Sequence, residues 1–415
     1  MTPAQRFLLL LVGLSAAAVL LRGLSRRARI PYAVVLAAGG MAVGTIPGVP
    51  TQVVSPDLIL LAFVPGLVFE ACLTLDLSSL RRVIAPVALL ATAGVAVTVV
   101  VLGLLAHSLL GLRLADAMVL GAVLAPTDPI AVVSLVRRQE APRRLATLLE
   151  GESLLNDGTG VAVFAALVAS IGAGAPSAQD VLARFAVETV GGAAVGILVG
   201  AIGVALLRAV TEPQVEILVT LMIAYGGYLA ADLLDASGIM AVVAVGVVVA
   251  GTGRRLRLHG EELTDFWAVL AFVLNAILFL LVGTAVPARH LLDVAGTVVA
   301  AFLLMLAARA LPVYGLLTLA DPRVRTIPWR WRHLVFWAGL RGALSVALAL
   351  SLSHNRSVDS RVATIAYGVV VLSLLVQGGL VGIVARRLRI GAGEWAGSGR
   401  PGGGPPAASS RFKGR

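Results

Sequence analysis

Charged residues are scarce in this chain. Only 13% of its 415 residues are Asp, Glu, Lys or Arg, whereas about a quarter would be charged in a soluble globular protein. Hydrophobic residues make up 59%, more than a core of this size can hide from water. The composition excludes an ordinary soluble fold and indicates that a lipid bilayer surrounds most of the chain.

Cysteine and lysine are almost absent as well. Cys72 is the single cysteine, so no disulfide can form within the chain, and cysteine usage gives no indication of the redox compartment. Lys413 is the single lysine, so arginine carries nearly all of the positive charge.

Long apolar runs are what the sequence has in abundance. Runs of about 20 residues, enough to cross a hydrocarbon core of ~30 Å, recur between short polar breaks. A basic cluster follows the first run instead of preceding it, which favours a retained transmembrane helix over a cleaved signal peptide. The pattern predicts an all-α polytopic membrane protein with about thirteen transmembrane helices, near residues 7–21, 30–47, 57–75, 83–108, 115–136, 148–172, 179–207, 214–234, 238–252, 264–286, 291–319, 333–353 and 361–385.

The arginines alternate between the connections, dense in one and sparse in the next. By the positive-inside rule, the odd-numbered connections and the carboxyl terminus are predicted to be cytoplasmic and the amino terminus outside. The net charge of +11 is therefore a signal of topology and of contact with anionic lipids, not of nucleic-acid binding. The dense connections contain Arg22, Arg26, Arg27 and Arg29, then Arg81 and Arg82, then Arg137, Arg138, Arg143 and Arg144, then Arg254, Arg255 and Arg257.

The composition changes at the end of the last apolar run. Residues 1–390 are predicted to form one transmembrane domain. Residues 391–415 are rich in Gly, Pro, Ser and Ala without any hydrophobic period, so a disordered cytoplasmic tail is expected there.

We single out seven ionisable residues inside the predicted spans. A charge near the centre of a membrane helix costs ~2.5–3.5 kcal/mol on insertion scales, so such residues usually face a cavity or a partner and mark function. Asp232 lies close to a loop and needs no such explanation. The other six are Glu70, Asp128, Glu152, Asp157, Arg309 and Arg341.

The stretch "AVLAPTDPIAV" predicts a broken helix in mid-span. Pro126 and Pro129 each remove a backbone donor, and each disfavours helical geometry at the residue before it. The helix is expected to break at 125–128 and to restart with Pro129, with Asp128 as its N-cap. Unwound backbone at membrane depth lies inside protein or beside a water-filled cavity, and its free carbonyls can bind a cation.

The stretch "GESLLNDG" supplies more oxygen ligands. On a helix, Ser153, Asn156 and Asp157 are related as i, i+3 and i+4, so one face presents a hydroxyl, an amide and a carboxylate, which suit a hard cation such as Na⁺. Glu152 lies about 100° round the helix and needs a separate partner.

Two arginines are candidates for that partner. We predict that Glu152 pairs with Arg341, which lies in mid-span within "GLRGALS". Arg341 could instead neutralise the carbonyl ends of a broken helix. Arg309 is a possible additional buried base with a similar structural role.

The buried acids outnumber the buried arginines by two charges. Protons or a bound cation must balance this excess, and burial makes protons compete for the same carboxylate oxygens. A site that holds either H⁺ or a metal cation, in a protein that can rock around it, predicts an exchanger and not an enzyme.

The same residues resemble a known family. "FEACLTLD", "TDP", "GESLLNDG", "FLLVG" and "GLRGALS" occur in the order found in cation:proton antiporters, specifically the electroneutral sodium/hydrogen exchanger branch, over roughly residues 10–390. The resemblance implies about thirteen helices in inverted repeats, with two crossing discontinuous helices at the ion site. It also implies a homodimer in the cell membrane, with dimerisation helices about 1–80 and 214–286 and core ion-transport helices about 83–172 and 291–390.

The resemblance also implies residue roles. Asp157 would be the main carboxylate for cation and proton, with Na⁺ bound at Asp157, Asp128 and Ser153. Thr127 and Asn156 would complete or brace the site, and Glu70 would lie near the ion path from the other domain. Asparagine at position 156 resembles the electroneutral branch. No cofactor is expected beyond the transported Na⁺ (or Li⁺) and H⁺.

Three alternatives remain at this stage. K⁺/H⁺ exchange would use the same oxygen ligands. A channel would conduct without tight coupling to protons. An intramembrane protease would need a base beside its serine, whereas the five histidines lie near loops or span ends, at His107, His259, His290, His333 and His354.

Overall fold

The computed structural model describes residues 13, 16–23, 25, 27, 32–44, 56–129, 132–133, 136–137, 141–172, 178–256, 260–284, 293–320, 327–352 and 357–390. Within these residues every regular element is a helix. Seven helices are long and apolar enough to cross a membrane, and five shorter apolar helices accompany them. The expected all-α polytopic membrane protein is confirmed. The predicted tail, 391–415, lies outside the described residues, as does most of the first predicted span.

The helices follow the apolar runs closely. The order is α2 Tyr32–Gly44, α3 Pro56–Thr74, α4 Leu77–Leu89, η1 Leu90–Gly94, α5 Val95–Leu110, α6 Leu114–Val123, α8 Arg143–Gly172, α9 Ala178–Ala209, α10 Pro213–Asp232, α11 Gly238–Leu256, α12 Gly260–Thr284, α14 Ala295–Ala310, η2 Leu311–Leu316, α15 Leu317–Ala320, α16 Trp329–Trp337, α17 Ala343–Leu352 and α18 Ser360–Arg387. The elements η1 and η2 are π-helical turns inside longer helices.

Local chemistry accounts for several helix ends. The Asp76 carboxylate accepts from the Ser78 N–H and caps α4, and Asp359 caps α18 through the Arg361 N–H. The helix α5 ends at Gly111, whose φ of 67° is left-handed and suits glycine. Each cap fixes a boundary that the apolar runs alone leave uncertain.

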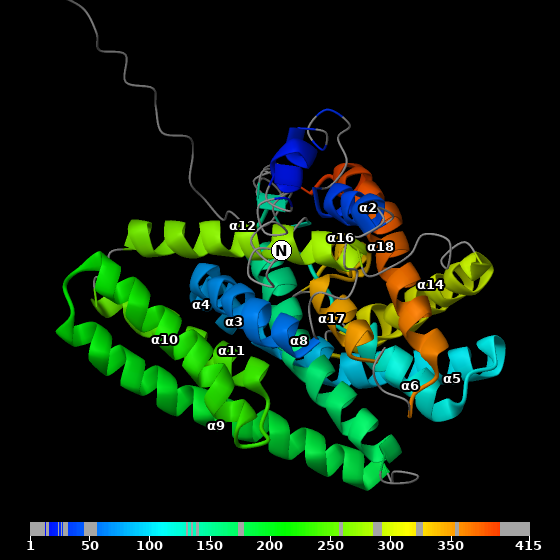
Figure 1. Cartoon of the computed structure of the whole chain (residues 1–415), viewed down its shortest axis with the longest axis horizontal. Coiled ribbons are helices and arrows are strands. Elements are labelled where there is room, and N and C mark those ends of the chain that lie inside the picture. The colour runs from blue at the N-terminus through cyan, green and yellow to red at the C-terminus, as the bar shows by residue number, and fades with distance from the viewer. Residues whose placement is uncertain are drawn as a thin grey trace, which may run out of the picture.

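Two hydrophobic clusters organise the molecule. In Figure 1, α9, α10 and α11 lie together on one side, whereas α5, α6, α14 and α18 lie on the other, with α3 and α8 between them. One cluster joins α9, α10 and α11 to α3 and part of α12, and includes Phe69 and Trp267. The other joins α5, α6, α14, α17 and α18.

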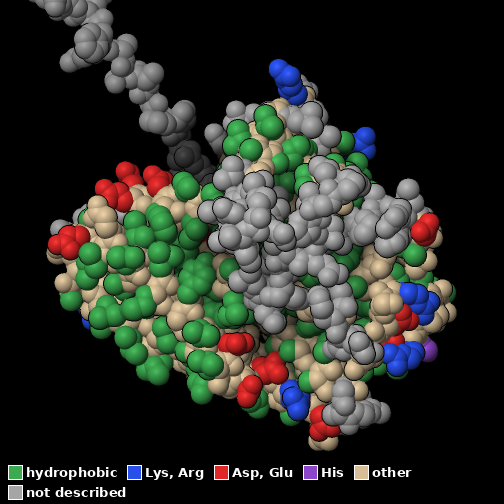
Figure 2. All heavy atoms as spheres, in the orientation of Figure 1, with side chains coloured by type: hydrophobic (Ala, Val, Ile, Leu, Met, Phe, Trp, Pro, Cys, Tyr) green, Lys and Arg blue, Asp and Glu red, His purple; other side chains and the backbone are tan. Residues whose placement is uncertain are grey.

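Hydrophobic side chains also cover the outside. Figure 2 shows them spread over the part formed by α9, α10 and α11, where a soluble protein would carry charge. Examples from α9 and α10 are Val190, Leu198, Ile202, Leu218 and Met222, all exposed. This surface suits lipid, as expected for a chain whose solvent is the bilayer.

Candidate functional site

Two helices are broken at the centre of the molecule. The helix α6 ends at Val123, and residues 126–129 have no regular secondary structure. The second break separates α16, which ends at Trp337, from α17, which begins at Ala343. The Asp128 N–H donates to the Leu340 carbonyl oxygen at 2.7 Å, so the two unwound segments cross. The break predicted at 125–128 is confirmed, and the Val133 N–H donates to the Pro129 oxygen at 2.8 Å, as in a helix that restarts at Pro129.

Arg341 holds the crossing together. Its side chain is completely buried, and its Nη1 donates to the carbonyl oxygens of Ala125 at 2.9 Å and Pro126 at 3.0 Å. Its backbone N–H donates to the Ser373 Oγ of α18. The guanidinium thus neutralises the carbonyl end of α6, the alternative role considered for this residue.

The predicted pair of Glu152 and Arg341 is wrong. Glu152 forms a two-pronged ion pair with Arg309, with Nη1 to Oε1 at 2.6 Å and Nη2 to Oε2 at 2.9 Å. Both side chains are buried, which makes the pairing necessary. The sequence offers two buried arginines, and only the tertiary structure, in which the Arg309 side chain of α14 reaches Glu152 of α8, selects between them. Arg309, expected as an additional buried base, is the partner.

Two side chains of α8 form hydrogen bonds with the unwound segment at Thr127. The Ser153 hydroxyl donates to the Thr127 carbonyl oxygen at 2.5 Å. The Asn156 amide donates to the Thr127 Oγ1 at 2.8 Å and accepts from the Thr127 N–H at 3.3 Å. It also donates to Glu152 at 3.3 Å. Asn156 therefore braces the crossing, and it is not among the residues that line the cavity described next.

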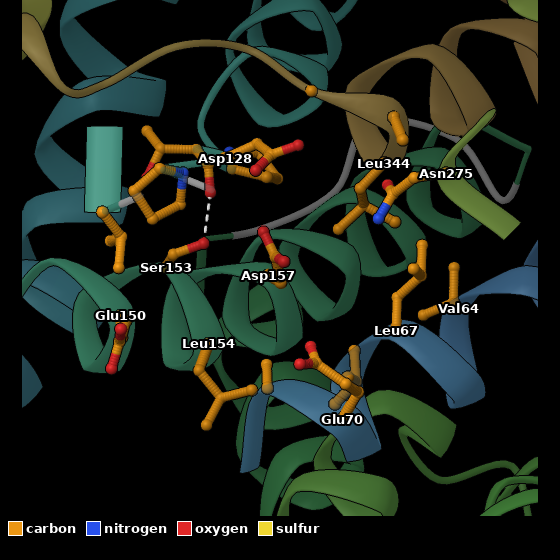
Figure 3. A pocket seen from close by; sticks show the side chains of 18 of the residues that line it. Val64, Leu67, Glu70, Asp128, Glu150, Ser153, Leu154, Asp157, Asn275 and Leu344 are labelled. Atoms are coloured by element: carbon orange, nitrogen blue, oxygen red, sulfur yellow. Dashed lines mark hydrogen bonds between the residues drawn. The ribbon is translucent and has the colours of Figure 1, made fainter. Parts of the chain in front are cut away.

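A cavity of about 250 Å³ opens beside the crossing. Asp128 lines it from the unwound segment, Ser153 and Asp157 from α8, and Glu70 from α3. Figure 3 shows Asp157 between Asp128 on one side and Glu70 on the other, all directed toward the same space. The Cβ and carboxylate of Asp128 lie against Gly342, at the amino-terminal end of α17, where a larger residue would clash.

The cavity gathers most of the predicted site residues. Asp128, Asp157, Ser153, Thr127 and Glu70 all line it. The described residues contain no group of three His, Cys, Asp or Glu side chains arranged as a metal centre, so hydroxyl and carbonyl oxygens would have to complete the coordination of any cation here. Asp232 is exposed at the end of α10, as its position close to a loop in the sequence predicts.

Five polar residues that line the described part of the cavity are not among the predicted ones, and two of them are Thr74 and Ser345. Asn275 lines the cavity from α12, and Arg137 and Glu150 form an ion pair at another part of the lining. Two signals point to them in the sequence. Glu150 precedes Asp157 by seven residues and so shares its helix face, and Asn275 is a single amide in an apolar run.

Comparison with known proteins identifies the family. Residues 13–387 match the family described as sodium/hydrogen exchanger, transmembrane. The chain is 35% identical over 356 residues to the Na⁺/H⁺ antiporter ApNhaP of Aphanothece halophytica, covering 84% of this chain and 68% of that one. It is 36% identical over 353 residues to the Na⁺/H⁺ antiporter NhaP of Pseudomonas aeruginosa, covering 81% and 82%.

A solved structure shares the fold. The sodium proton antiporter MjNhaP1 of Methanocaldococcus jannaschii superposes with a TM-score of 0.76 at 20% identity, covering 92% of this chain and 99% of that one. At this low identity the structural similarity is evidence for a shared fold only. The family match is evidence from the sequence itself, and it spans most of the chain. The chain therefore belongs to the transmembrane sodium/hydrogen exchanger family.

Proposed function

We propose that this protein exchanges Na⁺ for H⁺ across the membrane by alternating access. The observation that carries the proposal is the pair of carboxylates, Asp128 and Asp157, that line one cavity at the crossing of two broken helices. The relatives named above are described as Na⁺/H⁺ antiporters. Membership of a transporter family removes the protease alternative.

Asp157 is the carboxylate that alternates between cation and proton in this proposal. It occupies the middle of the cavity, while Asp128 and the Ser153 hydroxyl supply further oxygens for Na⁺. Glu70 faces the same space from α3 and would attract the cation along its path. Thr127 and Asn156 hold the unwound segment in place.

One shared site makes the two ions competitors. A protonated Asp157 loses the charge that attracts Na⁺, and bound Na⁺ excludes the proton, so each transit carries one or the other. Electroneutral exchange is proposed because position 156 holds a neutral amide that is occupied as a brace. Li⁺ would fit the same oxygens, and K⁺/H⁺ exchange is the second candidate, since hydroxyl and carboxylate oxygens accept that ion as well.

The architecture that fits this exchange has about thirteen helices in two inverted repeats. The two breaks, at 124–129 and 338–342, lie in opposite halves of the chain, as a repeat would place them. Helices about 1–80 and 214–286 would form the dimerisation domain of a homodimer, and helices about 83–172 and 291–390 the moving core. The separate hydrophobic cluster of α3 and α9–α12 supports such a division.

The same proposal places the protein in the cell membrane. The amino terminus would be outside and the carboxyl terminus cytoplasmic. The support is the alternation of arginine-rich and arginine-poor connections.

Antiport in proteoliposomes tests the function. An internal pH dye would report proton flux after addition of Na⁺, Li⁺ or K⁺ at clamped zero voltage. Wild type should show a Na⁺-dependent flux that Asp157→Asn abolishes and Asp128→Asn cripples, with both variants folded. The control is Asp232→Asn, which neutralises an exposed acid at the end of α10 and should exchange normally.

Each outcome has a meaning. Proton flux that occurs with K⁺ alone would support the same exchange mechanism with K⁺ as the substrate in place of Na⁺. Retained exchange in Asp157→Asn would remove that residue as the carrier, and no cation-coupled flux in wild type would refute the proposed function.

A further inference from the structure

An ion pair lies in the cavity lining that the exchange itself does not use. The Arg137 Nη2 donates to the Glu150 Oε1 at 2.6 Å, and both residues line the cavity. The Arg137 side chain is 51% exposed and the Glu150 side chain 16%. Arg137 belongs to one of the arginine-dense connections, which the positive-inside rule places on the aqueous side of the membrane surface. The pair therefore marks an end of the cavity that is open to solution.

The position of the pair along α8 sets its distance from the carrier carboxylate. Glu150 precedes Asp157 by seven residues, two turns of helix, or roughly 10 Å at a rise of about 1.5 Å per residue. Figure 3 shows Glu150 at one end of the α8 segment and Asp157 further along the same face. Arg137 thus lies too far from Asp157 to bind the same ion, and close enough to act on it through its field.

A fixed positive charge is unexpected in a cavity that collects cations. Among the residues that the structure describes, the other charged ones that line the cavity are the acids Glu70, Asp128, Glu150 and Asp157. Arg137 acts electrostatically on Glu70 of α3 with the opposite sign to Glu150, so both members of the pair influence the potential across the cavity. Because low-dielectric walls focus such fields, one charge at the opening changes the local cation concentration.

We propose that the charge of Arg137, held at the cavity opening by Glu150, sets the apparent affinity for the cation that enters from that side. The proposal rests on the proposed function and deepens it. The positive charge of Arg137 weakens the attraction of the acidic cavity for cations. Its removal should lower the KM for the cation and leave the maximal rate nearly unchanged, because Arg137 does not touch Asp157.

The alternative is an ordinary surface ion pair. Exposed pairs of this kind contribute little to stability, and such a pair would leave the KM unchanged when it is removed. The chain offers a matched control in Arg361 and Asp359, whose side chains are 57% and 23% exposed and lie 2.8 Å apart. Neither of these two residues lines the cavity, and Arg361→Gln makes the same change in net charge as Arg137→Gln.

The test is the Na⁺ dependence of proton flux in proteoliposomes at low ionic strength. Arg137→Gln should lower the KM by about three- to tenfold, as expected for a unit charge at roughly 10 Å in a medium between protein and water. Glu150→Gln should raise it, because the guanidinium then loses its counter-charge. Arg137→Lys and Arg361→Gln should resemble wild type. Added choline chloride should reduce the differences by screening.

The outcomes separate the two proposals. An unchanged KM in folded Arg137→Gln, or an equal shift in Arg361→Gln, would overturn the role of Arg137 while leaving exchange intact. If wild type shows no flux, the proposed exchange is refuted. The role of Arg137 is then tested by the Na⁺ concentration that stabilises the detergent-solubilised protein against thermal unfolding. A midpoint at lower Na⁺ in Arg137→Gln supports its role, and an unchanged midpoint refutes it.

Discussion

The guanidinium groups of Arg309 and Arg341 lie in the same buried region and have different partners. Arg309 faces the Glu152 carboxylate, and Arg341 faces the carbonyl oxygens of Ala125 and Pro126. An arginine stays charged when buried, so each must be balanced by an acid or by oriented dipoles. Because one arginine is balanced by a carboxylate and the other by carbonyl dipoles, removing each one should change the stability of the protein in a different way.

Arg309→Ala should reduce the free energy of unfolding by about 3–5 kcal/mol, because it leaves a buried carboxylate without its partner. Adding Glu152→Gln should restore part of that loss. Arg341→Ala should also destabilise, yet Glu152→Gln should not restore it, since Arg341 neutralises carbonyl groups. Thermal unfolding of the purified variants in detergent measures all four. Equal restoration in both backgrounds would contradict this assignment of partners.

Single elements are fixed by groups at their ends. Asp359 accepts from the Arg361 backbone N–H at 2.9 Å and so caps α18, and its own N–H donates to Asp116 near the start of α6. Asp116 in turn binds Arg113 at 2.6 Å. The cap thus joins the beginning of α18 to the beginning of α6, the helix that leads to the crossing.

The Asp359 cap should make stability depend on pH. Hydrogen bonds from the Arg361 side chain hold the pKa of Asp359 below its usual value. A carboxylate with a lowered folded-state pKa contributes stability above its unfolded pKa of about 4 and loses it as pH falls toward the folded value. Asp359→Ala should destabilise by about 0.5–2 kcal/mol at pH 7.

Thermal unfolding of wild type and Asp359→Ala between about pH 3 and 7, roughly the range that brackets the unfolded pKa, measures the stability contributed by the cap at each pH. The difference between them should shrink as pH falls below about 4. A constant difference over the whole range would show that the cap works without the carboxylate charge.

At the scale of the whole molecule, the cavity lies between two packed bodies. The helix α3, most of whose buried residues belong to one hydrophobic cluster, supplies Glu70 and Leu67. The helix α17, whose buried residues belong to the other cluster, supplies Leu344. Figure 3 shows Leu67 and Leu344 facing each other across part of the cavity. Alternating access requires these surfaces to move relative to each other.

A covalent link across the cavity should therefore stop exchange. With Cys72→Ala as background, Leu67→Cys and Leu344→Cys would be joined by a short bifunctional thiol reagent and assayed in proteoliposomes. Exchange should be lost on linking, and each single-cysteine variant should keep it after the same treatment. Full exchange in the linked protein would argue against relative movement of α3 and α17.

Much of this molecule follows from the sequence alone. Apolar runs of membrane length give helices with little ambiguity, because backbone groups in lipid must be satisfied within each segment. Pro126 and Pro129 together favour the first break, since each removes a backbone donor and clashes with the preceding turn, although the single prolines Pro65 and Pro86 lie inside α3 and α4. Asp128, Ser153 and Asp157 could be singled out because charge and polarity are costly in mid-span.

Other features were decided only by tertiary structure. The sequence has two buried arginines for one Glu152, and the tertiary arrangement of the helices brings Arg309 of α14 to it. Asn156 has the right spacing for a cation ligand, yet the approach of the unwound segment engages it with Thr127. In the sequence Arg137 is one of several arginines in a connection between helices, and only the folded structure shows that it lines the cavity. Spacing along one helix predicts which side chains share a face, whereas a partner on another helix depends on how the helices pack.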